Sequence, residues 1–235
     1  MAEADPLARP VWSSLTGRWA PLTSAVAGAR RLDPDYGVFA AIDDRSPETL
    51  EALGELVRRH GETALVEPDP APSVPGVEVA AAAAVLQMVA RRPVEIPDDG
   101  LRPAALIEED AAEMFDLAIL TKPGPWRPLT HRFGGFIGLK RDGRLVAMAG
   151  ERMRVDGATE VSGVCTRPGY RGRGYGAGLL TRVAAAMQQR GETPFLHVYA
   201  WNTGAIALYE QLGFSVGREL TMTTLKPASS VTSAV

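Results

Sequence analysis

The sequence predicts a mixed α/β (α+β) fold, in which a mixed central sheet is flanked by helices and preceded by a smaller α/β unit. Three observations lead to this expectation. Asp-Gly hairpin signals join apolar stretches in the second half of the chain. A strand–loop–helix–strand pattern follows them. Earlier in the chain, two proline-rich segments interrupt the sequence. The length of 235 residues is enough for one large domain or two small ones.

The proline-rich segments set the expected domain boundaries. Four prolines in residues 67–76 require an extended loop, because proline fixes φ and removes a hydrogen-bond donor. A second break predicts a linker at residues 94–103. The linker would separate an N-terminal α/β unit of unknown role, residues 1–93, from a second unit at residues 104–227. A disordered tail is expected at residues 228–235.

The first unit shows β/α alternation. An apolar run at 36–42 predicts a buried strand, and Ser46-Pro47 supplies a helix N-cap followed by proline at the first helical position. A further strand is expected at 63–67. Residues 77–90 fit both structures, because their alanines favour a helix whereas the opening Val-Glu-Val alternates like a strand.

The second unit gives clearer signals. Asp142-Gly143 and Asp156-Gly157 are hairpin turns between apolar runs. The expected elements, in chain order, are a helix at 107–120, strands at 136–140, 145–155 and 159–166, a helix at 175–190, a strand at 194–199, a helix at 203–212 and a strand at 215–226.

Composition excludes several classes of protein. Twenty-five basic against 28 acidic residues give a net charge of −3, which argues against a nucleic-acid partner. A single cysteine, Cys165, cannot form an internal disulfide, and three dispersed histidines predict no metal site. The first residues lack a signal-peptide pattern, and the longest apolar stretch is too short to span a bilayer. We therefore expect a cytoplasmic protein with no membrane partner.

Residues 166–178 carry the strongest chemical signal. Glycines crowd the junction between a strand and a helix, together with Arg167, Arg171 and Arg173. Glycine allows a ligand to approach the backbone, the helix N-terminus offers unpaired N–H groups, and arginine binds phosphate oxygens. This pattern predicts a pyrophosphate site. The alternative is a glycine-rich turn that only permits tight packing.

Two nucleotide motifs fit this loop less well. Residues 172–177 match a loose dinucleotide fingerprint, Gly-x-Gly-x-x-Ala. That fingerprint also requires an acidic residue at the end of the next strand, where residues 199–201 read Tyr-Ala-Trp. A phosphate loop of the Gly-Lys-Ser/Thr type is absent. A nicotinamide cofactor is therefore disfavoured.

The loop resembles a known family. Residues 171–176, Arg-x-x-Gly-x-Gly, are similar to the coenzyme A loop of the GCN5-related N-acetyltransferases (GNAT). Residues 202–214, Asn-x-x-Ala-x-x-Leu-Tyr-Glu-x-x-Gly-Phe, are similar to the family's other signature. The resemblance covers roughly residues 104–227. It is strongest to the FR47-like branch shared with glycine N-acyltransferase C-terminal domains, whose N-terminal half can be a degenerate copy of the fold.

The resemblance implies a GNAT-type fold with acetyl-CoA as co-substrate. The Val164 N–H would stabilise the oxyanion, and Tyr209 would protonate the departing thiolate, unless it is only a packed helix tyrosine. Asn202 would contact the cofactor arm, although a helix N-cap explains it equally well. The remaining cofactor contacts would come from the strand residues Val164, Cys165 and Thr166 and from the loop residues Arg171, Gly172, Arg173, Gly174, Tyr175 and Gly176.

Acceptor-side roles are less specific. Glu160 lies where some family members carry a general base, and a charge on a strand edge is the alternative. His197 is a candidate second base, or a core histidine. Trp126 and His131 lie in a region that lines the acceptor pocket in the family. Cys165 has no histidine or aspartate beside it in sequence, so we expect a core residue.

The sequence therefore predicts an acetyl-CoA-dependent N-acetyltransferase that transfers the acetyl group directly, in a ternary complex, to a primary amine of a small molecule or amino acid. It would act as a monomer or homodimer. The alternative is a non-catalytic acyl-CoA-binding regulatory module. Glu160 and Tyr209 separate the two, because the module would keep cofactor binding without turnover.

Overall fold

The structure, a computed structural model, describes residues 5–229 and forms two compact units. Unit 1 holds residues 5–34, 38–84 and 220–229 of that range. Unit 2 holds residues 35–37 and 85–219. Most of the tail expected at 228–235 lies outside the described residues.

This division does not follow chain order. Strand β5 (Val77–Val89) begins in unit 1 and ends in unit 2, and β11 (Ser215–Pro227) returns the chain to unit 1. The linker expected at 94–103 belongs to unit 2, where Asp99 pairs at 2.6 Å with Arg182 of helix α4 (Tyr175–Gln189). The contacts of this segment, rather than its proline content, decide where it belongs.

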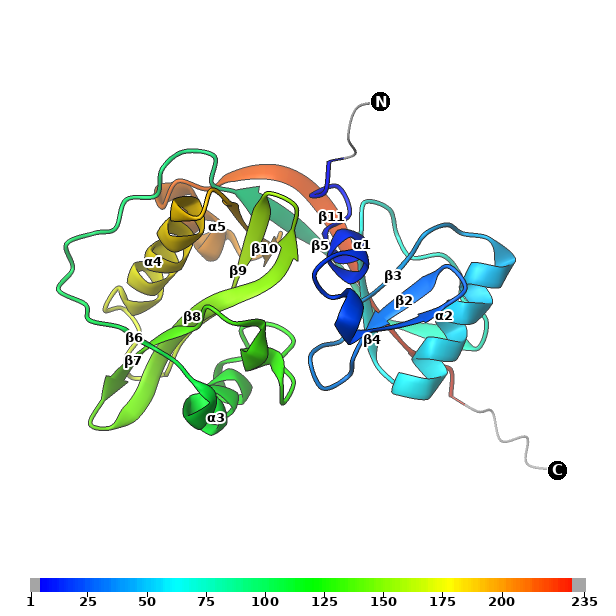
Figure 1. The fold of residues 1–235 in the computed structure, drawn as a ribbon, viewed down its shortest axis with the longest axis horizontal. Helices are drawn as coiled ribbons and strands as arrows, with labels where there is room; N and C mark the ends of the chain where they lie inside the picture. The colour runs from blue at the N-terminus through cyan, green and yellow to red at the C-terminus, as the bar shows by residue number, and fades with distance from the viewer. Residues whose placement is uncertain (1–4, 230–235) are drawn as a thin grey trace. The chain divides into compact units, whose positions relative to one another are not determined.

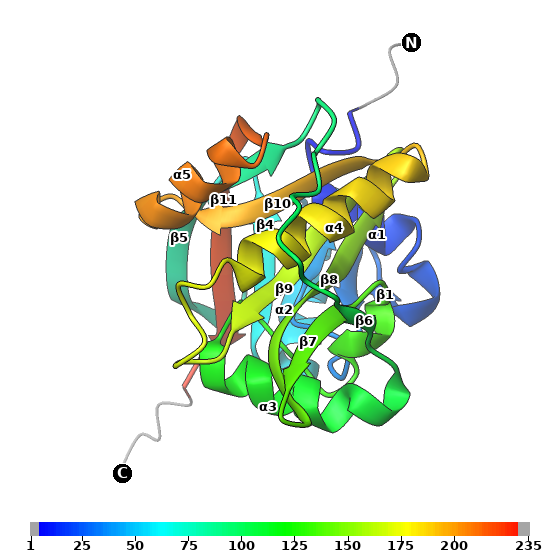
Figure 2. The same cartoon turned by 90° about the vertical axis from the view of Figure 1, so that its left-hand side faces the viewer.

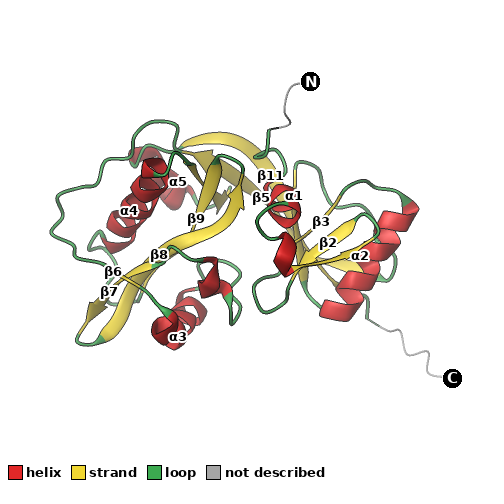
Figure 3. Cartoon of the chain, in the orientation of Figure 1, coloured by secondary structure: helices red, strands yellow, loops and turns green. Residues whose placement is uncertain are grey.

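Unit 1 contains a three-stranded antiparallel sheet in the order β1-β2-β3, shown with its helices in Figure 3. Strand β4 begins just after α2 and pairs antiparallel with β11. The bounds are α1 (Pro10–Thr16), β1 (Thr23–Val26), β2 (Ala29–Leu32), β3 (Ala40–Ile42), α2 (Pro47–His60) and β4 (Thr63–Glu67).

Local chemistry accounts for α2. The Ser46 hydroxyl accepts a hydrogen bond from the Thr49 N–H at 3.3 Å, and Pro47 occupies the first helical position, as the sequence predicts. Elements α1, β1 and β2 have no equivalent signal. Helix α1 has seven residues and no side-chain cap, and β2 carries Arg31, which is 1% exposed.

The strands of unit 2 belong to the mixed sheet that the sequence predicts. This sheet has eight strands in the hydrogen-bonded order β4-β11-β5-β10-β9-β8-β7-β6, which includes β4 of unit 1. Strands β9 and β10 form a parallel pair (Figure 1). The bounds are β6 (Ala104–Ala105), α3 (Ala111–Thr121), β7 (Ile137–Arg141), β8 (Arg144–Val155), β9 (Ala158–Thr166), α4 (Tyr175–Gln189), β10 (Thr193–Tyr199) and α5 (Thr203–Gln211).

Two helices cover opposite faces of this sheet. Helix α4 lies across β8, β9 and β10 (Figure 2), where Leu179 and Leu180 are fully buried. Helix α3 contacts β8 and β9, and its Leu117 packs in a separate core with Met148 and Cys165. The ambiguous residues 77–90 form strand β5. Its residues 85–89 pair antiparallel with β10, and the sheet order places β5 between β11 and β10, so its place in the sheet overrides the helical preference of the alanines at 80–84.

Candidate active site

Strand β9 contains a bulge in its second half. Ser162 lies opposite Gly150 and Cys165 opposite Met148, so Gly163 and Val164 together face a single residue of β8. Gly163 has a φ of +63°, a conformation that favours glycine. A bulge disrupts the ladder locally and re-aims the backbone. The bulge therefore falls at Val164, the residue predicted to stabilise an oxyanion.

The bulge site leaves no space for a larger residue. A Cβ built on Gly163 would lie 2.9 Å from Phe136 Cε1 and 3.2 Å from Trp126 Cζ3. The Trp126 and Phe136 rings meet edge to face at 5.3 Å, and Trp126 is 8% exposed. Trp126, predicted to contact substrate, is thus a core residue packed directly beneath the bulge.

Strands β9 and β10 pair over a short stretch. Ala158–Glu160 lies in parallel register with Thr193–Phe195, and the register ends there. Both strands continue, to Thr166 and Tyr199. Backbone groups of β9 beyond Glu160 are therefore available on this side to an extended ligand, in the manner of strand addition.

The glycine-rich loop is open on its outer side. Gly172 and Gly174 have φ values of +76° and +75°, and no atom lies within 4 Å of a Cβ built on either. Gly174 is the N-cap residue of α4, which has no acidic residue in its first turn. Arg171 is exposed, and its Nε donates to the Thr166 carbonyl at 3.3 Å. The loop thus offers backbone N–H groups, open space and a positive charge, which together fit a pyrophosphate.

A fourth arginine, Arg141, lies beside the glycine-rich segment, although it comes from a different part of the sequence. The Arg141 guanidinium lies 5.4 Å from the Tyr175 ring centre, and the Arg173 guanidinium lies 5.2 Å from that of Tyr170. Hydrogen bonds from Arg141 and Arg173 lower the pKa of Tyr175. Sequence reasoning missed Arg141 because it belongs to the β7–β8 hairpin.

Glu160 sits at the centre of a buried charged cluster. Its carboxylate, 0% exposed as a residue, accepts hydrogen bonds from Nε and Nη2 of Arg152, both at 2.7 Å. The His197 Nδ1 lies 2.8 Å from Oε1. Burial opposes ionisation, but Arg152 and His197 outweigh it and lower the pKa of Glu160 to about 2. Glu160 is therefore a paired carboxylate at neutral pH.

His197 connects this cluster to β5. Its Nε2 lies 3.4 Å from Nε2 of Gln87, which is 1% exposed, and its ring meets Phe195 edge to face at 5.7 Å. Arg152 and Gln87 carry no motif in the sequence. Only the adjacency of β5, β8, β9 and β10 reveals their role.

On α5, Asn202 caps the helix and Tyr209 packs inward. The Asn202 Oδ1 accepts a hydrogen bond from the Ala205 N–H at 3.2 Å. Tyr209 packs against the α4 core, with its ring 6.3 Å from Phe214. Burial raises the pKa of the Tyr209 hydroxyl, which therefore keeps its proton at neutral pH.

The other predicted residues differ in character. The His131 Nε2 lies 3.1 Å from Oε2 of Glu108, so the ring is tied to a neighbouring loop. Cys165 is buried in the α3 core, and burial raises the pKa of its thiol to about 11, which fits a packing residue better than a nucleophile.

Among residues 5–229, no group of three or more metal-ligating side chains gathers. No helix in that range has the length and apolar character to cross a membrane.

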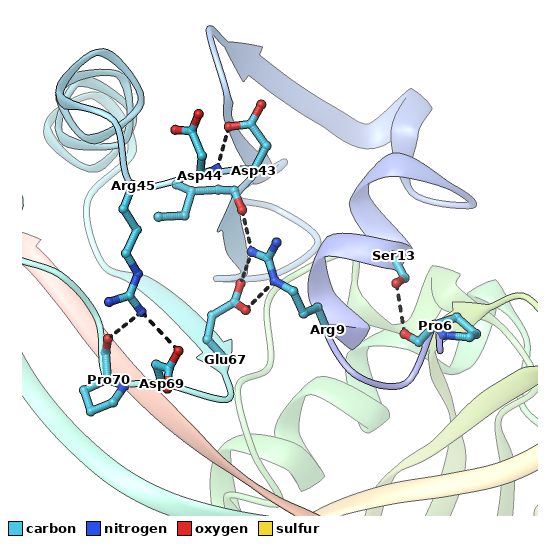
Figure 4. Close-up of polar contacts among 10 residues, drawn as sticks. Pro6, Arg9, Ser13, Asp43, Asp44, Arg45, Glu67, Asp69 and Pro70 are labelled. Atoms are coloured by element: carbon cyan, nitrogen blue, oxygen red, sulfur yellow. Dashed lines mark hydrogen bonds and ion pairs between the residues drawn. The ribbon is translucent and has the colours of Figure 1, made fainter. Parts of the chain in front are cut away.

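Unit 1 contains a separate cavity of about 190 Å³ beside the ends of β3 and β4. Figure 4 shows polar contacts among several of the residues that line it. Arg9 forms a two-point ion pair with Glu67 there and also bonds the Ile42 carbonyl. Arg45 donates to the Pro70 carbonyl at 3.1 Å. Arg9 and Arg45 thus form hydrogen bonds and ion pairs with other residues of this chain, and we assign no chemistry to the cavity.

Comparisons with known proteins agree with this geometry. The family model described as FR47-like protein matches residues 136–222. A crystal structure of a GNAT-family acetyltransferase from Novosphingobium aromaticivorans is 49% identical, with a TM-score of 0.89, over 96% of this chain and 100% of that one. A GCN5-related N-acetyltransferase from Kribbella flavida shares the fold, with 20% identity and a TM-score of 0.65 over 97% and 98% of the two chains.

A curated relative matches only part of the chain. The [ribosomal protein bS18]-alanine N-acetyltransferase of Escherichia coli K12 is 37% identical over 78 residues, which is 33% of this chain and 52% of the relative. The chain thus spans about half the length of the curated relatives it matches. The near-complete match to the Novosphingobium structure settles the family. This chain belongs to the GNAT family of acetyltransferases, with an FR47-like domain in its second half.

Proposed function

We propose that this protein transfers the acetyl group of acetyl-CoA directly to a primary amine. One observation carries the proposal. The β9 bulge at Val164 and the open arginine-glycine loop at residues 171–176 lie at the end of one strand and in the loop that follows it. An anion site and a strand edge in this order suit an extended molecule with a pyrophosphate at one end and a thioester at the other.

Binding begins at the loop. Arg171 and Arg173 neutralise pyrophosphate charge, and the first N–H groups of α4 donate to its oxygens. The open positions at Gly172 and Gly174 allow close backbone approach. The extended arm then runs along β9 past Thr166 and Cys165, where its amide groups bond to the strand backbone.

The chain's own groups then serve the transfer. Acetyl-CoA supplies an activated acyl group and a thiolate leaving group. The Val164 N–H donates to the thioester carbonyl oxygen, where negative charge develops as the amine attacks. Tyr209 carries its proton at neutral pH, as a phenol with a pKa of about 10 or above does, and so it has a proton to donate to the thiolate.

The acceptor is proposed as a small amine or an amino acid. A second candidate is a protein N-terminus that begins with alanine, because the matched Escherichia coli relative is described as a ribosomal-protein alanine N-acetyltransferase. The two differ in size, so a panel of simple amines, amino acids and alanine-terminated peptides separates them.

The test measures thiol release from acetyl-CoA with each member of this panel. We expect turnover that depends on the amine and falls by about 10²-fold or more in Tyr209→Phe, because a positioned acid contributes about 10²–10⁴-fold. Binding of acetyl-CoA should persist in that variant. Tyr36→Phe, remote from α5 in sequence, is the matched control. Retained binding without turnover for any amine would favour the non-catalytic module.

A further inference from the structure

The amine must lose a proton during transfer, and Glu160 is poorly placed to take it. Both carboxylate oxygens are occupied: Oε1 by Arg152 and His197, and Oε2 by Arg152 and the Met153 N–H at 3.3 Å. A proton on Glu160 would break this buried ion pair. Neutralising one partner of a buried ion pair destabilises the folded protein strongly, because the other charge stays buried without compensation. Glu160 is therefore built to remain ionised.

The ionised Glu160 fixes the tautomer of His197. A carboxylate without a proton can only accept, so the hydrogen bond of 2.8 Å requires the hydrogen on Nδ1 of His197. In the neutral ring, Nε2 then carries the lone pair. On β5, the amide nitrogen of Gln87, a donor, lies 3.4 Å from this Nε2. Both neighbours favour the tautomer with its hydrogen on Nδ1 and its lone pair on Nε2, and the 3.4 Å contact with Gln87 must open when Nε2 takes a proton from another donor.

The position of His197 also suits this role. Phe195 of β10 pairs with Glu160 of β9. His197 and Ser162 each lie two residues further along these parallel strands, so they stand at the same level, just before the bulge. Its neighbours Leu196 and Val198 pack into the α4 core, so His197 faces the other side of the sheet. Here β9 and β10 have stopped pairing, beside the strand edge proposed for the thioester.

We propose that Nε2 of His197 accepts the amine proton and that Glu160 is a positioning residue held by Arg152. This inference rests on the proposed function. The amine nitrogen forms a bond to the acyl carbon, and the carbon–sulfur bond breaks. The amine proton passes to Nε2, directly or through a water, and the Tyr209 proton passes to the thiolate sulfur. Glu160 balances the charge of the imidazolium.

The first experiment reads the tautomer. The chain has three histidines, so selective ¹⁵N-histidine labelling gives a simple spectrum, and His197→Gln assigns the signal. In alkaline buffer, where the rings are neutral, we expect His197 to carry its hydrogen on Nδ1. In Glu160→Gln we expect a mixture of the two tautomers, because an amide can accept or donate. A hydrogen on Nε2 in the unmodified chain would overturn the inference.

The second experiment tests whether His197 lies beside bound acetyl-CoA. Diethyl pyrocarbonate labels accessible imidazole nitrogens, and mass spectrometry reports each histidine separately. We expect saturating acetyl-CoA to slow labelling of His197 at least tenfold and to leave His60, in unit 1, unchanged. Binding of acetyl-CoA without protection of His197 would refute this inference and leave the proposed function standing. Failure of the chain to bind acetyl-CoA at all would refute both.

Discussion

Removal of Arg152 should destabilise unit 2 strongly. In Arg152→Met the buried Glu160 loses both 2.7 Å hydrogen bonds and its compensating charge. Breaking a buried pair by removing one partner costs about 3–5 kcal/mol. Because the ion-paired side chains are only 12% and 1% exposed, solvent cannot substitute for the lost partner. The folded protein would have to protonate Glu160 or admit water.

The same contacts also make the stability of the folded chain depend on pH. Arg152 and His197, against burial, lower the pKa of Glu160 from 4.5 to about 2 in the folded state. An acid whose folded pKa is lowered adds stability above its unfolded pKa, and that stability is lost as pH falls between about 4.5 and about 2. A difference of this size corresponds to roughly 3 kcal/mol.

Urea unfolding, followed by circular dichroism at neutral pH and at about pH 3, measures both effects. We expect Arg152→Met to be less stable by about 3–5 kcal/mol at neutral pH. We also expect its stability to fall less between neutral pH and about pH 3, because the contribution of ionised Glu160 is already lost. Arg132→Met is the matched control, since its ion pair with Glu108 is 47% and 59% exposed, so water can replace the lost partner and little stability should be lost. Equal losses in the two variants, or an unchanged acid slope in Arg152→Met, would refute the reasoning.

Two further variants test local features of the site. Asn202→Ala should lower the free energy of unfolding by about 1 kcal/mol, because it removes the N-cap of α5, and thermal unfolding measures this loss. If acetyl-CoA binding falls much more than stability does, Asn202 contacts the cofactor directly. Gly163→Ala should be more damaging than Gly157→Ala, since both have positive φ but only Gly163 faces the Phe136 and Trp126 rings. Similar unfolding free energies for these two variants would show that the bulge tolerates a side chain.

Signals local in sequence predicted much of the fold. Asp142-Gly143 and Asp156-Gly157 both fall between strands, and α2 begins at the Ser46-Pro47 cap. The mixed sheet and the family were also predicted, and the comparisons confirm them. These features depend on residues that are neighbours in the chain, so their physical causes are visible without the fold.

Features that depend on distant strands were not predictable. Strand β5 forms because it lies between β11 and β10 in the sheet, against the helical preference of its alanines. The same adjacency brings Gln87, Arg152 and His197, from three other strands, into one cluster with Glu160. Sequence reasoning singled out Glu160 and His197 separately, because nothing in their spacing shows that they share a hydrogen bond. The roles predicted for the loop residues remain predictions.

The central claim is that residues 171–176 bind the pyrophosphate of acetyl-CoA, and isothermal titration calorimetry tests it directly. The unmodified chain should bind acetyl-CoA, and Arg171→Ala should weaken binding about tenfold or more, because one charge-assisted hydrogen bond contributes about 1.5–3 kcal/mol. Arg144→Ala, which removes an exposed arginine from the β7–β8 hairpin, should bind as the unmodified chain does. Equal affinity in Arg171→Ala and Arg144→Ala, or no binding by the unmodified chain, would contradict the account.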